Sequence, residues 1–154
     1  MRPEYPSIVY TQILKKLYPD VPVVLGGIEA SMRRLSHYDY WQDRLKKSIL
    51  CESGADMLIY GMGEKPICEL VRRLTALCDN QDGVISSSDI HSPALSSIPQ
   101  TAYLTRKYES DENDITLYSH EECLADKKKQ ATNFRHIEEE SNKYAAARIV
   151  PVSY

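Results

Sequence analysis

The sequence predicts an α/β protein built on a parallel β-sheet with flanking helices. Two short apolar runs, residues 21–25 and 57–60, are each followed by glycines. Strands that are apolar on both faces are typical of parallel sheets buried between helical layers. Helical patterns precede, separate and follow these runs. The order helix, strand, helix, strand, helix therefore predicts parallel pairing with right-handed crossovers.

The first predicted helix covers residues 7–18, behind Pro6 as a start signal and before Pro19 as a stop signal. Its apolar residues recur at the i, i+3, i+4 and i+7 spacing of a helix. These residues are Tyr10, Ile13, Leu14 and Leu17. The predicted strand over 21–25 follows directly.

A second helix is predicted over residues 40–52, with Gly54 at the place of a C-cap glycine. Its apolar residues lie four apart: Trp41, Leu45 and Ile49. The strand 57–60 comes next, and a third helix is predicted from Pro66 until residues 79–83 end it. One apolar stripe runs along this third helix, made of Ile67, Leu70, Val71, Leu74, Leu77 and Cys78.

The second half predicts two short strands, 102–104 and 115–118, and then a long helix from 119 to about 146. Ser119 followed by Glu122 is a capping-box pattern for the start of that helix. Two parallel strands alone would leave both sheet edges open. The sheet is therefore completed either by the short strands or by residues outside this chain, and we favour the second.

The composition of the 154 residues is that of a globular protein without a basic surface. The net charge of −3 argues against binding to nucleic acid. No apolar run is long enough to span a bilayer and no signal pattern opens the chain, so we expect a cytoplasmic protein that does not bind membranes. The four cysteines lack the spacing of a metal site, and we expect no metal in this chain.

Two glycine-rich loops are predicted at the carboxyl ends of the strands, where open α/β sheets bind ligands. Paired glycines let a backbone approach a ligand, and the following helix offers N–H donors to an anion. Each loop could also be a structural turn, because neither matches a nucleotide fingerprint. The candidate cofactor-binding residues are Gly26, Gly27, Ile28, Glu29, Gly61, Gly63 and Glu64.

A charged segment follows the first glycine loop and forms a candidate ligand patch. It contains Arg33, Arg34, His37 and Asp39. One interpretation is a site for an anionic ligand or substrate, with His37 titrating near neutral pH. The other is a solvated loop whose charges pair among themselves. Spacing predicts no catalytic residues anywhere in the chain.

The segments GGIEASMRRLSHYDYW (26–41) and ADMLIYGMGE (55–64) resemble the YgiQ-type radical S-adenosylmethionine (SAM) family. The segment 133–142 also resembles the part of that family that precedes its catalytic barrel. The resemblance implies a partial Rossmann-like sheet, similar to cobalamin-binding and flavodoxin-like domains. In such domains the two glycine loops line the groove for the nucleotide tail of the cofactor.

Two family motifs are absent. The CxxxCxxC that would hold a 4Fe–4S cluster does not occur in the chain. The Asp-x-His-x-x-Gly loop of cobalamin domains is also absent, because Asp89-Ile90-His91 continues to Ala94 where the glycine should stand. The first absence predicts a catalytically inert chain. The second argues against bound cobalamin.

The resemblance implies an accessory N-terminal region of a radical SAM enzyme whose substrate the sequence does not identify. The parent protein would carry a 4Fe–4S cluster and S-adenosylmethionine, and the downstream barrel of the same polypeptide would be the partner. We divide the chain into a cobalamin-binding-like half-domain (1–83), a loop and short-strand extension (84–118), and a long helix with a tail (119–154). The alternative is a non-catalytic, vestigial cobalamin-type binding module, which could form a homodimer through the long helix.

Overall fold

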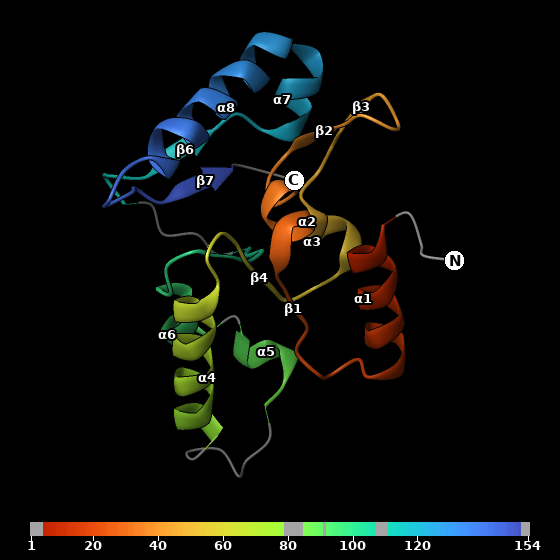
Figure 1. Cartoon of the computed structure of the whole chain (residues 1–154), viewed down its shortest axis with the longest axis vertical. Coiled ribbons are helices and arrows are strands. Elements are labelled where there is room, and N and C mark those ends of the chain that lie inside the picture. Colours follow the sequence, from red (N-terminus) through yellow and green to blue (C-terminus); the bar gives the residue numbers. More distant parts are fainter. Residues whose placement is uncertain (1–4, 79–84, 91, 107–110, 152–154) are drawn as a thin grey trace. The chain divides into compact units, whose positions relative to one another are not determined.

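The computed structural model describes residues 5–78, 85–90, 92–106 and 111–151 (Figure 1). The chain divides into two compact units, each formed from two separate stretches. The first unit contains residues 1–35 and 48–106, and the second contains 36–47 and 107–154. Residues 84–106, which the sequence analysis placed in the extension, group with the first unit.

The first unit is built on a mixed, three-stranded sheet with the order β1-β4-β5. Strands β1 (Val24–Leu25) and β4 (Met57–Ile59) pair in parallel, as the sequence predicted. Strand β5 (Thr101–Ala102) pairs antiparallel with the other edge of β4. We predicted that residues outside the chain complete the sheet. This prediction is wrong at this edge of β4, because a short strand from the second half of the chain occupies it.

Helices cover both faces of this sheet. They are α1 (Pro6–Leu17), α2 (Gly27–Met32), α3 (Ile49–Ser53), α4 (Glu64–Cys78), α5 (Ser87–Ile90) and α6 (Pro93–Ser96). Helix α4 begins at Glu64 rather than at Pro66. Gly54 ends α3 in the left-handed conformation, with φ of 75°, which confirms the predicted glycine cap.

Strand β4 connects the two apolar cores of the first unit. Its side chains alternate, so Leu58 packs with Leu25 and Ala30 in one cluster. Met57 and Ile59 pack in the other cluster, with Leu70, Ile90, Leu95 and Ile98. The three strand residues are at most 5% exposed, which confirms the prediction of a strand buried on both faces.

The helix predicted over residues 40–52 is wrong for most of its length. Residues His37–Asp39 (β2) and Arg44–Lys46 (β3) instead form an antiparallel hairpin in the second unit. The tip of the hairpin excludes a helix, because Asp43 is left-handed (φ 48°) and the Asp39 carboxylate accepts a bond from the Gln42 N–H. Trp41 is 84% exposed, so the four-residue spacing did not mark a buried face.

The long predicted helix is two helices, α7 (His120–Ala125) and α8 (Lys127–Ser141). The predicted capping box of Ser119 and Glu122 is confirmed at the start of α7. Asp126 then leaves the helical conformation, and its carboxylate accepts a bond from the Lys128 N–H to cap α8. The same unit pairs β6 (Ile115–Leu117) in parallel with β7 (Ile149–Pro151).

Candidate functional site

The two glycine loops meet at the carboxyl ends of β1 and β4. The Ser31 hydroxyl of α2 accepts a hydrogen bond from the Gly61 N–H at 3.1 Å and donates one to the Gly27 carbonyl at 2.8 Å. Gly27 and Gly61 both have positive φ, 83° and 69°, which explains why these positions suit glycine. One hydroxyl thus joins two loops that lie 30 residues apart in sequence.

A third segment, at Gln100, closes the second loop. The Tyr60 N–H donates to the Gln100 carbonyl at 3.0 Å, and the Gln100 side-chain amide donates back to the Tyr60 carbonyl at 3.3 Å. A Cβ atom added at Gly61 would lie 2.9 Å from the Gln100 Nε2 atom. Sequence reasoning missed Gln100, since it stands in a loop without any motif.

The charged residues of α2 are engaged with their neighbours. The Glu29 carboxylate accepts bonds from the Ser7 N–H at 3.2 Å and from Arg33 at 3.3 Å, so it caps the start of α1. Arg33 also lies over the Tyr5 ring, 4.7 Å from its centroid. Two predicted site residues, Glu29 and Arg33, therefore connect α2 to α1.

Arg34 lies closer to the glycine loops. Its guanidinium donates to the Ser31 carbonyl at 2.6 Å and stacks 4.9 Å from the centroid of the Tyr60 ring. Of the residues predicted for the ligand patch, Arg34 therefore contacts both Ser31 and Tyr60, which precedes Gly61.

The remaining residues of the patch belong to the second unit. His37 pairs with Lys46 across the hairpin, and Asp39 pairs with Arg44. Asp39 is 3% exposed and holds the hairpin tip, as described above. The patch is therefore divided between the two units.

The Asp89-Ile90-His91 sequence, which begins like the cobalamin loop, is described in part. The Asp89 carboxylate accepts a hydrogen bond from the Ser86 N–H, and His91 lies outside the described residues.

The edge beside the glycine loops also carries exposed apolar side chains. Ile28 is 84% exposed, Met32 73% and Met62 75%. Gly63 precedes α4, where its carbonyl accepts from the Ile67 N–H, and Glu64 is the exposed first residue of that helix. These exposed apolar side chains lie beside the Ser31 hydroxyl and the Arg34 guanidinium, which are both engaged in contacts within the chain.

The groups with shifted pKa values are not among the predicted site residues, and each shift has a structural cause. Hydrogen bonds from Arg72 and Arg73 lower the pKa of Glu69 on α4 to about 2. Burial lowers the pKa of His120 and raises that of the Cys123 thiol, both in the second unit. Within the described ranges, no group of His, Cys, Asp and Glu is arranged to hold a metal ion.

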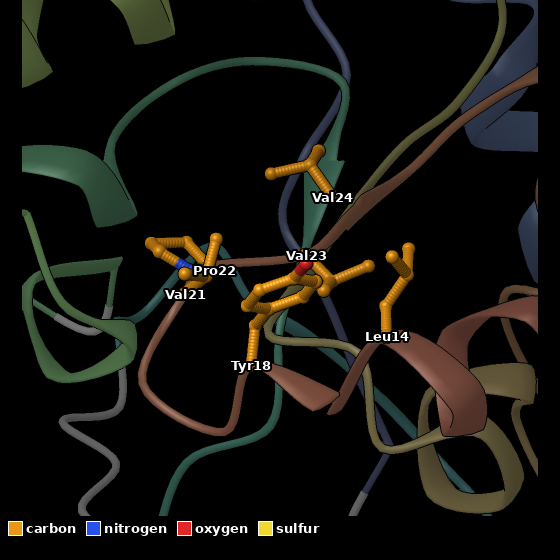
Figure 2. Close-up of a pocket in the computed structure, with 6 residues that line it drawn as sticks. All are labelled: Leu14, Tyr18, Val21, Pro22, Val23 and Val24. Atoms are coloured by element: carbon orange, nitrogen blue, oxygen red, sulfur yellow. The ribbon is translucent and has the colours of Figure 1, made fainter. Parts of the chain in front are cut away.

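An apolar pocket of about 200 Å³ lies at the other end of β1 (Figure 2). It is lined by Leu14, Tyr18, Val21, Pro22, Val23 and Val24. Figure 2 shows the Tyr18 ring with Leu14 on one side and Val21 and Pro22 on the other. The pocket lies before and at the start of β1, whereas the predicted glycine loop follows the strand. It is therefore distinct from the predicted cofactor site.

The comparisons with known proteins place almost the whole chain in one group. A family model described as radical SAM N-terminal matches residues 1–153. A UPF0313 protein of Bacteroides thetaiotaomicron is 70% identical over 151 residues, which are 97% of this chain and 24% of the relative. Those of Porphyromonas gingivalis and Geobacter sulfurreducens are 58% and 40% identical, and the match covers 22% and 23% of them.

The chain spans about a quarter of the length of these relatives. No solved structure matches it. No helix in the part of the chain that the structure describes is long and apolar enough to cross a membrane.

Proposed function

Because the chain belongs to the radical SAM N-terminal family, we propose that it is an accessory domain of a cytoplasmic radical SAM enzyme. The observation that carries this proposal is the family match over 1–153, combined with relatives of which the chain is about a quarter. The resemblance found in the sequence is thereby confirmed at the level of the family. The parent's reaction and cofactors are part of the proposal, which names no substrate.

In this proposal the chain itself does not cleave S-adenosylmethionine. A 4Fe–4S cluster requires several convergent cysteine thiolates, commonly in a closely spaced motif. The four cysteines of this chain have no such spacing, and the described ones form no ligand group. The cluster would therefore be held by residues outside this chain, and this domain would support or cover the site where they act.

The glycine loops do not fit cobalamin, the cofactor suggested by the resemblance. The Ser31 hydroxyl bridges the two loops, and Gln100 lies against Gly61 so closely that even a Cβ would meet it. These contacts support the proposal that the chain's own side chains fill the place where a nucleotide tail would enter. We propose that these glycines allow the loops and Gln100 to pack together.

A second candidate function, a binding module of vestigial cobalamin type, is favoured by the same closure of the loops. In that case Ile28, Met32 and Met62 would contact a partner through apolar surface, since exposed apolar groups at one edge mark interaction sites. The two functions differ in whether the polypeptide as a whole performs radical chemistry.

The test uses the full-length polypeptide that contains this chain, reconstituted anaerobically with iron and sulfide and then reduced. Formation of 5′-deoxyadenosine from S-adenosylmethionine, lost when the cluster cysteines become alanine, supports the accessory domain. A well-formed cluster without product favours the binding module. Added cobalamin is monitored separately by its absorption spectrum, and stoichiometric retention would contradict the structural role of the glycine loops.

A further inference from the structure

Helix α1 leaves its apolar stripe exposed, while its inward face combines Ile8, which packs on the core, with polar residues. Thr11 is 2% exposed and Lys15 is half-buried, so polar residues point into the first unit. The apolar stripe is instead exposed, with fractions of 55% for Tyr10, 48% for Ile13, 44% for Leu14 and 63% for Leu17. A helix on the surface of a globular protein normally shows the opposite arrangement.

Polar contacts fix this orientation. The Lys15 ammonium lies 2.6 Å from the Asp56 carboxylate, which is almost buried and also accepts a bond from the Val23 N–H at 2.7 Å. The Gln12 amide donates to the Glu52 carbonyl at 3.0 Å. Turning the helix to bury the stripe would remove the cation from Asp56, and a buried charge without its partner is strongly unfavourable. The outward position of the stripe is therefore a property of the fold.

The stripe continues into the pocket of Figure 2. Leu14 belongs to both, and Tyr18 and Val21, which line the pocket, are 58% and 53% exposed. We name the combined surface the α1 patch; it consists of Tyr10, Ile13, Leu14, Leu17, Tyr18 and Val21. It contains no charged residue, and its pocket of about 200 Å³ could receive an apolar side chain. Patches of this kind, with an anchor pocket, are typical of protein interfaces.

We propose that the α1 patch is the docking surface for the remainder of the longer polypeptide, namely an apolar face of its radical SAM region. This inference rests on the proposed function. In the 70% identical relative, about three quarters of the polypeptide lies outside the matched segment. Such a region is large enough to supply a stable interface, which buries several hundred square ångströms on each side (roughly 800 Å²). The partner face is apolar, with one protruding side chain for the pocket.

The test places a photo-cross-linking amino acid at position 17 of the full-length polypeptide. Position 75 on α4 is the matched control, because Thr75 is exposed and its hydroxyl donates to the Val71 carbonyl of its own helix. Cross-linking requires side-chain contact, so we expect a yield about tenfold higher at 17 than at 75, in peptides from the radical SAM region. Tandem mass spectrometry identifies the cross-linked peptides.

Three outcomes would overturn the proposal: equal yields at the two positions, cross-links to peptides of residues 1–154, or cross-links between two copies in a mixture of isotopically labelled and unlabelled protein. A second measurement does not depend on the modified residue. Tyr38, which is 59% exposed, is the control for Tyr10 (55%) and Tyr18 (58%) because the three have similar exposure within this chain. Hydroxyl-radical oxidation of Tyr10 and Tyr18 in the unmodified full-length protein should be slower than that of Tyr38. Equal oxidation rates would also overturn the proposal.

These readouts are separate from catalysis. A cross-link at position 17 in a protein that forms no 5′-deoxyadenosine would support the docking surface and reject the proposed enzyme. An active enzyme without the cross-link would reject the docking surface alone. The variant Leu17→Lys should abolish the protection of Tyr10 and Tyr18 from oxidation. The control variant Lys16→Gln, at the exposed neighbouring position, should leave that protection unchanged.

Discussion

The Ser31 hydroxyl lies 3.1 Å from the Gly61 nitrogen and joins the loops that follow β1 and β4. The same hydroxyl donates to the Gly27 carbonyl, so it lies between the two glycine loops. The family resemblance implied that these loops bind a cofactor. The closure of this edge, and the outward stripe of α1, are the two features from which the function of the chain can be tested.

Removing the Ser31 hydroxyl should destabilise the first unit. Ser31→Ala leaves the Gly61 N–H without its partner, and a lost hydrogen bond of this kind costs about 1 kcal/mol of unfolding free energy. Urea denaturation followed by circular dichroism measures the change. Thr75→Val is the control, because it removes a hydroxyl that donates to the carbonyl four residues earlier in the same helix. Equal losses in the two variants would show that the link to Gly61 contributes nothing.

Gly61→Ala should lower the unfolding free energy by more than the backbone strain of a positive φ alone would. Both Gly61 and Gly54 have positive φ, so alanine is strained at either position by about 1 kcal/mol. At Gly61 the new Cβ would also meet Gln100 Nε2 at 2.9 Å, whereas at Gly54 no atom of the described residues lies within 4 Å. The difference between Gly61→Ala and Gly54→Ala should disappear in a Gln100→Ala background, as thermal denaturation would show. A difference that survives would mean that Gln100 does not cause it.

Two methionines should differ sharply in their contribution to stability. Met57 on β4 is fully buried, so Met57→Ala should lower the unfolding free energy by about 2–5 kcal/mol. Met62 in the second glycine loop is 75% exposed, and Met62→Ala should change it by less than about 0.5 kcal/mol. Chemical denaturation measures both. A large loss at Met62 would contradict its assignment to the accessible edge.

Glu69 should titrate well below an ordinary glutamate. Hydrogen bonds from Arg72 and Arg73 stabilise its ionised form, which lowers its pKa to about 2. The folded pKa is depressed, so the ion pairs stabilise the fold above the unfolded pKa of about 4.3 and lose this effect as pH falls from there towards about 2. The effect is small, since these side chains are partly exposed to solvent.

Carbon-detected NMR of the side-chain carboxyl measures this titration. Arg72→Met should raise the Glu69 midpoint, because it removes the largest cause of the shift. Arg135→Met on α8 should leave the midpoint unchanged, since Arg135 pairs with Glu139. A midpoint above 4 in the unsubstituted protein would show that the ion pairs do not persist in solution.

Local signals predicted several elements correctly. The buried strand at Met57–Ile59, the glycine cap at Gly54 and the capping box of Ser119 and Glu122 each depend on residues close together in the chain. The family resemblance was likewise carried by contiguous segments, and the family match over residues 1–153 confirms it.

The spacing of apolar residues predicted helices wrongly at two places, where a local polar contact stabilises a turn instead. Trp41, Leu45 and Ile49 are spaced as in a helix, but Asp39 and the left-handed Asp43 bend residues 37–46 into a hairpin. The capping carboxylate of Asp126 similarly divides the long helix predicted from residue 119. A periodic pattern describes a face, and it does not detect a turn that one carboxylate stabilises within the pattern.

Only the tertiary structure decided which groups meet. The sequence by itself determined the family, the two parallel strands and the two glycine loops that follow them. It contained no sign that Ser31 would bridge those loops, or that Gln100 would close one of them, because these contacts join segments 30 and 40 residues apart. The apolar stripe of α1 was also visible in the sequence, but its direction depended on Lys15 meeting Asp56. A helical pattern specifies two faces, and the partner of a single charge decides which of them is buried.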